Sequence, residues 1–352
     1  MNPFIFEPKI PRVVFGAGSL QFLTREIDAM QARRALVLST PAQAAQAKLV
    51  AQILGDRAVG IFPKAVMHVP LELAREARSE ANRLGADCMV AIGGGSTIGL
   101  GKAIALEGGL PILAIPTTYA GSEMTSIYGL TEAGMKKTGR DPRVLPRTVI
   151  YDPELMLSLP FRMTASSGLN AIAHAAESLY AYNGNPVTAL MAEEGIRAIS
   201  SSLDPLHKNP LDITARCDTL YGSWLCGTVL GAVSIGLHHK LCHTLGGAFN
   251  LPHSELHAVV LPHALAYNSA GAPDALARIA RALGVQNAPT RLHELLHRYD
   301  LPVSLAELGM PRDAIDLAAN LAVKSPYPNP QPLEEERIRK LLERAYEGAA
   351  PD

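Results

Sequence analysis

The chain has 352 residues, of which 48% are hydrophobic and 18% charged, and its formal net charge is −1. This length allows two domains with a substantial core, and the balanced charge gives no electrostatic reason to expect nucleic acid or an anionic membrane as a partner. The sequence shows neither the pattern of a secretory signal nor a run near the roughly 18 apolar residues of a membrane span. We therefore expect a cytoplasmic protein with reduced thiols at its four scattered cysteines, Cys88, Cys217, Cys226 and Cys242.

Short apolar runs alternate with helical patterns over the first 150 residues. Such alternation is typical of βαβ units and of a mainly parallel sheet. Helical patterns at 42–54 and 71–84 lie between some of the predicted strands, which are 12–15, 35–39, 58–62, 88–92, 112–115 and 148–151. Residues 1–155 are therefore predicted to form an α/β domain with a Rossmann-like parallel sheet that binds a nucleotide.

The pattern changes after Asp152-Pro153, where alanine-, leucine- and glutamate-rich helical segments replace the strand runs. Residues 156–352 are therefore predicted to form an all-helical catalytic domain. Its clearest helical patterns are 163–182, 187–201, 213–233, 274–283 and 334–346.

A glycine-rich turn, Gly93-Gly94-Gly95-Ser96, follows the fourth predicted strand and precedes a helix. Consecutive glycines let the backbone approach a phosphate closely, and the helix start offers free N–H groups and the positive end of its dipole. The alternative is a turn that only links strand to helix. The earlier Gly16-Ala17-Gly18 lacks the third glycine of a dinucleotide fingerprint, and we expect it to be a turn that shapes the cofactor site.

Small hydroxyl residues follow the fifth predicted strand, at Thr117, Thr118 and Ser122. Loops at the carboxyl ends of parallel strands are where open α/β sheets bind ligands. We therefore expect these side chains to contact the cofactor, although a loop without a ligand would have the same composition.

Histidines concentrate in the back half, where six of the eleven lie between 238 and 263. His239 and His243 are four residues apart, as are Asn170 and His174, so each pair shares a helix face. Together with His253, which follows Pro252, they are predicted to converge on one active site. His257 and His263 lie in an apolar stretch, and we expect them to be packing or hydrogen-bonding residues.

In chain order, these motifs resemble the iron-containing (group III) alcohol dehydrogenase superfamily. The matching segments are 93–96, 116–118, 152–153, 170–174, 239–243, 252–253, 261–263 and 267–268. Within the superfamily, the stretches 116–125, 136–144, 169–174, 238–243 and 327–330 are most similar to the maleylacetate reductases. The resemblance implies the dehydroquinate synthase-like fold of that superfamily, with a Rossmann-like domain and an all-α domain, and a homodimer.

One residue departs from the pattern of the metal-dependent relatives, which have an aspartate where this chain has Asn170. An aspartate with three neutral imidazoles leaves a divalent ion at a net charge of +1, whereas asparagine leaves +2 and a weaker ligand. Ser254 also stands where glycine usually follows the Pro-His pair. We therefore expect catalysis to need no metal, with ligation by the neutral amide as the alternative.

The resemblance implies reduction of the carbon–carbon double bond of 2-maleylacetate to 3-oxoadipate in aromatic compound degradation. NADH is the expected cofactor. NADPH is also possible because Ser39, after the second strand, is not followed by the carboxylate that would repel its extra phosphate. Lys137 is expected to reach the cofactor or substrate. His243 is the first choice for proton donor or oxyanion stabiliser and His253 the second, and Lys240 is expected to bind a substrate carboxylate.

Three alternatives remain open from the sequence. The nearest is a metal-dependent alcohol or lactaldehyde dehydrogenase of the same superfamily. The second is a dehydroquinate synthase-like lyase that uses NAD only transiently, and the third is a nucleotide-binding protein without catalysis.

Overall fold

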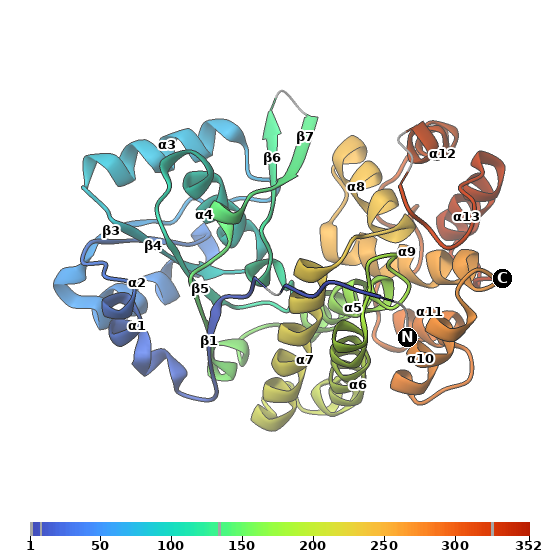
Figure 1. Cartoon of the computed structure of the whole chain (residues 1–352), viewed down its shortest axis with the longest axis horizontal. Helices are drawn as coiled ribbons and strands as arrows, with labels where there is room; N and C mark the ends of the chain where they lie inside the picture. The colour runs from blue at the N-terminus through green and yellow to red at the C-terminus, as the bar shows by residue number, and fades with distance from the viewer. Residues whose placement is uncertain (1–2, 8, 133–134, 325–326) are drawn as a thin grey trace. The chain divides into compact units, whose positions relative to one another are not determined.

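The computed structural model describes residues 3–7, 9–132, 135–324 and 327–352. The chain divides into two compact units, one spanning Lys9–Leu159 and the other Pro160–Asp352 together with the N-terminal segment. The first unit is an α/β domain and the second is helical, as Figure 1 shows. This is the predicted fold class.

The α/β unit is built on a six-stranded sheet in which every strand pair is parallel. The strands form where the sequence predicts them, in the spatial order β1-β8-β5-β4-β2-β3. Their bounds are β1 Arg12–Phe15, β2 Ala35–Leu38, β3 Ala58–Phe62, β4 Cys88–Gly93, β5 Ile112–Pro116 and β8 Thr148–Tyr151. The chain runs outward from β2 to β3 and then returns to the other side of β2 as β4. The carboxyl ends of β2 and β4 thus lie at a switch point, where open parallel sheets bind ligands.

Helices cover both faces of this sheet, because alternate side chains of each strand point to opposite faces. Val37 and Val90 pack on one face with α1 (Leu23–Ala29) and α2 (Ala44–Leu54). Leu36 and Met89 pack on the other face with α3 (Leu71–Arg83) and α4 (Gly95–Gly108). Both faces are buried, which explains the nearly continuous apolar runs that make these strands visible in the sequence.

The unit also contains an antiparallel hairpin that the sequence does not predict, formed by β6 (Ile127–Glu132) and β7 (Met135–Arg140). The residues of β6 are only partly buried, so no continuous apolar run marks this strand. The turn at Gly16-Ala17-Gly18 has a structural role, because the Asp152 carboxylate accepts hydrogen bonds from the backbone N–H groups of Gly18 (3.1 Å) and Leu20 (2.9 Å).

The helical unit packs around one apolar core to which the central helix, α5, contributes Leu169 and Ile172. Residues 164–178 of α5 are all buried, so polar side chains on this helix lie inside the unit. The helices are α5 Phe161–Ser178, α6 Pro186–Lys208, α7 Ile213–Ala232, α8 Leu237–Phe249, α9 His253–Asn268, α10 Pro273–Leu283, α11 Ala288–Arg298, α12 Ala314–Lys324 and α13 Glu335–Glu347. Among the described residues, no single helix has the length and apolar composition to cross a membrane; α7 and α8 do so only as a pair, separated by a 94° bend.

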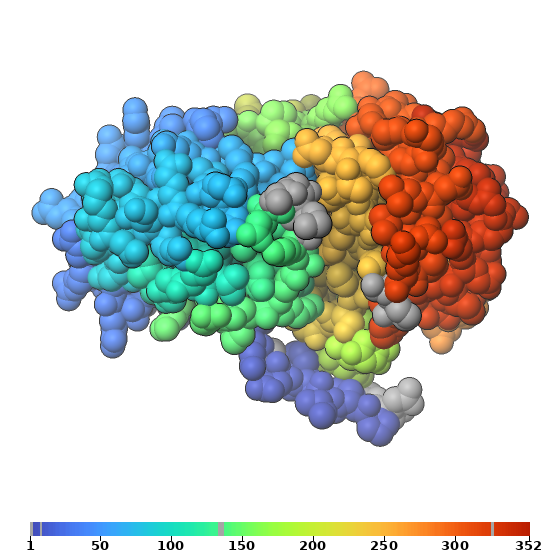
Figure 2. All heavy atoms as spheres, turned by 90° about the horizontal axis from the view of Figure 1, so that it is seen from above, coloured from blue at the N-terminus to red at the C-terminus, as the bar shows by residue number. Residues whose placement is uncertain are grey.

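Residues 3–7 of the N-terminal segment lie on the surface, in dark blue in Figure 2. They carry three exposed apolar side chains, Phe4, Ile5 and Phe6.

Candidate active site

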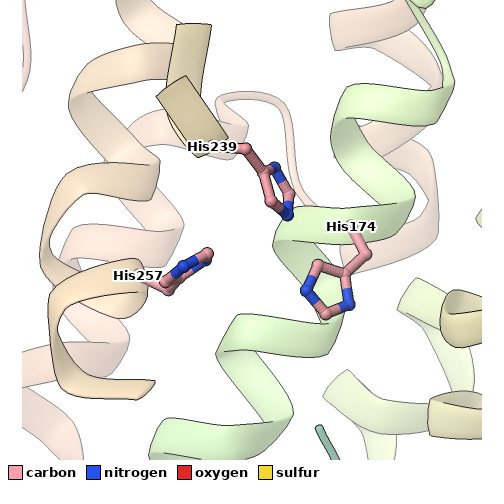
Figure 3. A group of neighbouring side chains, drawn as sticks. All are labelled: His174, His239 and His257. Carbon is pink, nitrogen blue, oxygen red and sulfur yellow. The ribbon is translucent and has the colours of Figure 1, made fainter. Parts of the chain in front are cut away.

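Three helices of the helical unit bring three buried histidines together. His174 lies on α5, His239 on α8 and His257 on α9, and their rings point into the space between the helices (Figure 3). One ring nitrogen of each lies within 4.8 Å of the others. Two of these residues, His174 and His239, are predicted from the sequence. The third, His257, is expected from the sequence to be a packing or hydrogen-bonding residue, and the structure places its ring beside the other two.

Unpartnered ligand atoms surround this space. Nδ1 of His174, Nε2 of His239 and both ring nitrogens of His257 are buried without a hydrogen-bond partner among the described residues. Oδ1 of Asn170, one helical turn before His174, is also buried and unpartnered. Buried polar atoms normally have partners, so this set indicates a site that binds a ligand. Three imidazole nitrogens and an amide oxygen suit a divalent transition metal.

Two histidines of the cluster, His174 and His257, favour their neutral form. Burial lowers the pKa of His174 and His257 well below the ordinary value, and the neighbouring histidines lower it further. Burial also lowers the pKa of His238 to about 4. Neutral imidazoles offer the lone pairs that a metal requires.

Glu177, on α5, is a buried carboxylate next to the cluster. The sequence analysis does not select it. Its Oε2 atom lies 2.6 Å from Nδ1 of His239, and both side chains are almost fully buried. Burial alone would raise the pKa of Glu177. The hydrogen bond from His239 and the electrostatic interactions with His239 and His238 instead lower it to about 2. The spacing of Asn170, His174 and Glu177 places all three on one helix face, and this periodicity is the signal that could have identified Glu177.

The other predicted catalytic residues lie around this centre. The ring centroid of His243, on α8, is 6.1 Å from that of His239. His253 is the first residue of α9; it is exposed, and its ring centroid is 4.3 Å from that of His257. Lys240 follows His239 on α8, with its Nζ atom 5.8 Å from the ring centroid of Tyr327. The structure thus brings all six predicted catalytic residues into one region of the helical unit.

The predicted phosphate-binding turn lies at the end of β4 in the α/β unit. Gly93 has a φ of +154°, and a Cβ atom there would lie 2.3 Å from the Thr97 hydroxyl oxygen. A Cβ on Gly94 would lie 2.8 Å from the Thr118 side chain, whereas Gly95 faces open space at the start of α4. Glycine is therefore required sterically at the first two positions. The open third position leaves room for a phosphate beside the helix N-terminus, with Ser96 next along the helix.

Two hydroxyl residues lie close to this turn on neighbouring strand ends. Thr117 follows β5, and its backbone N–H donates to the carbonyl oxygen of Gly93 at 3.1 Å. Its hydroxyl accepts a hydrogen bond of 2.5 Å from Gln43. Ser39 follows β2; it is buried and donates to the carbonyl oxygen of Thr40 at 3.1 Å. The structure thus groups Ser39, Thr117, Thr118 and the glycines at the switch point of the sheet.

The loop that contains Ser122 accepts hydrogen bonds from a buried lysine that the sequence analysis does not select. Lys102, on α4, donates to the carbonyl oxygens of Ser122 (2.7 Å), Thr125 (2.8 Å) and Ile127 (2.7 Å). Burial lowers the pKa of Lys102 to about 7, although the buried Glu123 opposes this shift. Glu123 in turn accepts a hydrogen bond of 2.7 Å from the Tyr151 hydroxyl.

The remaining predicted cofactor residue, Lys137, lies on β7. Its side chain is exposed and forms an ion pair with Glu132 on β6. The structure therefore places Lys137 on the hairpin, and its role with the cofactor stays a prediction.

Comparisons with known proteins define the class of the chain. The model of the iron-containing alcohol dehydrogenase family matches residues 10–153, and the model of the C-terminal part of that family matches residues 164–346. The chain belongs to the iron-containing alcohol dehydrogenase family.

Full-length relatives narrow the similarity to one group of enzymes within this family. A maleylacetate reductase of Burkholderia cepacia is 74% identical over 351 residues, covering 100% of both chains, and one of Sphingobium indicum is 57% identical over 99% of each. The crystal structure of maleylacetate reductase from Agrobacterium tumefaciens is 51% identical and superposes with a TM-score of 0.95 over 100% of both chains. These findings confirm the resemblance to maleylacetate reductases.

The expectation that the protein needs no metal is contradicted. The chain belongs to a family named for its iron, and three buried histidines meet the spacing of a metal site. The expectation relied on the missing charge of an aspartate at Asn170. It did not include His257 as a ligand or the ionised Glu177 one hydrogen bond from His239.

Proposed function

We propose that the protein is an NADH- or NADPH-dependent oxidoreductase that reduces the carbon–carbon double bond of 2-maleylacetate to give 3-oxoadipate. The observation that carries this proposal is the full-length similarity to maleylacetate reductases, at 74% identity, together with the histidine cluster. Products and substrate differ by one hydride and one proton, so the site needs a hydride donor and an acid.

The α/β unit binds the hydride donor in this proposal. The pyrophosphate of the nicotinamide cofactor lies against Gly94, Gly95 and Ser96 at the start of α4, where free N–H groups and the helix dipole favour an anion. Thr117, Thr118 and Ser122 offer hydroxyls to the rest of the cofactor, and Ser39 lies where the adenosine ribose reaches the end of β2 in such folds.

The helical unit holds the metal. His174, His239 and His257 would be its ligands, with Asn170 and His253 beside the same cluster. When bound, a divalent metal supplies a Lewis acid that polarises a ketone oxygen.

Substrate carboxylates are bound by Lys240 and Tyr327. The Lys240 ammonium lies over the Tyr327 ring, and the buried Tyr327 hydroxyl has no hydrogen-bond partner among the described residues. A cation beside an unused O–H donor suits a carboxylate, which accepts from both.

The reaction proceeds by conjugate addition. Hydride from the nicotinamide forms a C–H bond at the alkene carbon β to the ketone, and the π pair shifts to give an enolate whose negative charge lies on the ketone oxygen. A proton then adds at the α carbon, and the cofactor leaves oxidised. His243, at the rim of the cluster and less buried than His239, delivers that proton.

The test is NADH oxidation by the purified chain with maleylacetate, with simple aldehydes as controls. We expect rapid oxidation with maleylacetate, stoichiometric 3-oxoadipate, and far slower reaction with aldehydes. Rapid aldehyde reduction without turnover of maleylacetate would instead assign an alcohol dehydrogenase. Conversion of maleylacetate to a product of the same oxidation level, without net NADH consumption, would instead assign a lyase.

We further propose a cytoplasmic homodimer that acts on a small dicarboxylate. All four cysteines are free thiols, which supports a reducing compartment. The dimer is implied by the family resemblance, and light scattering after size exclusion tests it: a mass near twice the 37.5 kDa of one chain supports the dimer, and a mass near 37.5 kDa overturns it.

A further inference from the structure

Glu177 is surrounded by hydrogen-bond donors on both of its oxygens. Oε2 accepts from the Nδ1–H of His239 at 2.6 Å and from the backbone N–H of Gly236 at 2.9 Å. Oε1 accepts from the backbone N–H of His238 at 2.8 Å and from the Tyr180 hydroxyl at 3.3 Å. Among the described residues, Glu177 therefore faces four donors while it is about 1% exposed.

Two of these donors belong to the start of α8. Gly236 is the residue that precedes the helix and His238 lies in its first turn, where N–H groups have no partner within the helix. A carboxylate at this position satisfies them and is favoured by the helix dipole. Gly236 allows the close approach, because a Cβ atom there would lie 3.1 Å from Oε1 of Glu177. The same side chain thus fixes both the helix that carries His239 and the ring of His239 itself.

The contacts of the neighbouring ring are consistent with one tautomer of His239. His238 lies 3.0 Å from the carbonyl oxygen of His257 through Nε2, so that nitrogen carries its proton and Nδ1 is left as an acceptor. The Nδ1 atoms of His238 and His239 are 3.4 Å apart, and only one of them can be a donor in that contact. With a carboxylate on one side and a lone pair on the other, Nδ1 of His239 carries the proton. Its Nε2 atom then presents a lone pair to the cluster.

We propose that Glu177 is a positioning residue that locks His239 in the Nδ1–H tautomer and orients its Nε2 lone pair toward the metal position formed with His174 and His257. The proposal deepens the proposed function and rests on the same cluster. A carboxylate that orients a histidine ligand through its second nitrogen raises the basicity of that ligand, and loss of such a partner typically costs about 10- to 100-fold in metal affinity.

Glu177→Gln is the discriminating change. Each oxygen of Glu177 accepts from two donors, whereas a glutamine has one acceptor oxygen and one NH₂ donor. Two of the four donors would therefore face the NH₂ group of the glutamine instead of an acceptor. We expect the Nε2–H tautomer of His239 to become populated in this variant. Glu177→Asp keeps an acceptor-only group and is expected to restore the Nδ1–H tautomer in part.

The first measurement is the side-chain ¹H–¹⁵N correlation spectrum of the full chain without metal, with His239 assigned by comparison with His239→Gln. In the wild type, we expect the proton on Nδ1. A wild-type spectrum with the proton on Nε2 would overturn the proposal, and this readout decides the matter even if Glu177→Gln does not fold. It needs no substrate, so failure of the proposal is distinguishable from failure of the proposed reaction.

The second measurement is the dissociation constant for Zn²⁺ by competition with a chromophoric chelator. We expect Glu177→Gln to weaken binding by about 10- to 100-fold. Leu245→Ala is the matched control, because Leu245 is a fully buried core residue of α8 that is no ligand. It should lower stability and leave the Zn²⁺ affinity within about twofold. Equal weakening in both variants, or none in a folded Glu177→Gln, would contradict a positioning role.

Discussion

The Lys102 ammonium lies 2.7 Å from the carbonyl oxygen of Ser122, and this bond ties the helix that follows the glycine turn to the hydroxyl-rich loop after β5. Both segments are proposed to bind the cofactor. Their relative positions therefore depend on a buried lysine that donates hydrogen bonds to this loop and to the strand that follows it.

Lys102→Met should weaken cofactor binding. The substitution removes the donor and leaves buried carbonyl oxygens of Ser122, Thr125 and Ile127 without a partner, at a cost of about 1–3 kcal/mol each. We expect the dissociation constant for NADH, measured by fluorescence titration, to rise by at least about tenfold, which is about 1.4 kcal/mol. Lys64→Met is the control, because Lys64 forms an exposed ion pair in the same unit. A folded Lys102→Met chain with the wild-type NADH affinity would refute this role.

Asn170→Asp should strengthen metal binding. Asn170 is buried one turn before His174 with its Oδ1 atom unpartnered, and an aspartate would add a negative charge beside the cluster. We expect the dissociation constant for Zn²⁺ to fall by at least about tenfold, which is about 1.4 kcal/mol. Asn209→Asp adds the same charge at an exposed position and should change nothing. Unchanged affinity in Asn170→Asp would place the metal away from this residue.

Lys240→Gln should impair substrate binding selectively. The ammonium proposed to pair with a substrate carboxylate is removed, while the histidine cluster and the glycine turn remain. We expect the KM for maleylacetate to rise by about tenfold, as for loss of one charge-assisted hydrogen bond, with the KM for NADH unchanged. Lys208→Gln, on the exposed end of α6, is the control. The idea fails if kcat alone falls while the KM for maleylacetate is unaltered.

His263→Gln should change how stability depends on pH. His263 is buried on α9, and burial lowers its pKa to about 4, with His293 and Arg344 lowering it further. The unfolded chain, with an ordinary histidine pKa near 6.5, therefore takes up more protons between about pH 6.5 and pH 4. The free energy of unfolding should be fully retained above that window and fall as pH decreases through it, by at most about 1.4 kcal/mol per pH unit from this residue.

Urea unfolding at several pH values measures this slope. We expect His263→Gln to flatten it relative to the wild type, whereas the exposed His297→Gln should not. Identical slopes in wild type and His263→Gln would show that His263 is not held neutral in the folded state.

The sequence by itself determined the sheet and the class of the protein. Strands buried on both faces, such as 88–93, form continuous apolar runs, and Gly93 and Gly94 are required where backbone and side chains approach closely. Local spacing also predicted the Asn170–His174 and His239–His243 pairs, because helix periodicity is a local property.

Only the tertiary structure decided which residues complete the site. His257 lies in an apolar stretch whose sequence pattern is that of a packing residue, and its place beside His174 and His239 depends on how α9 packs against α5 and α8. Glu177 and Lys102 were missed for the same reason. From the sequence alone, a charged residue on a helix is expected to be solvated. It becomes a buried positioning group only when the fold brings its partners to it from distant segments. These partners are Gly236 and His239 for Glu177, and Ser122 and Thr125 for Lys102.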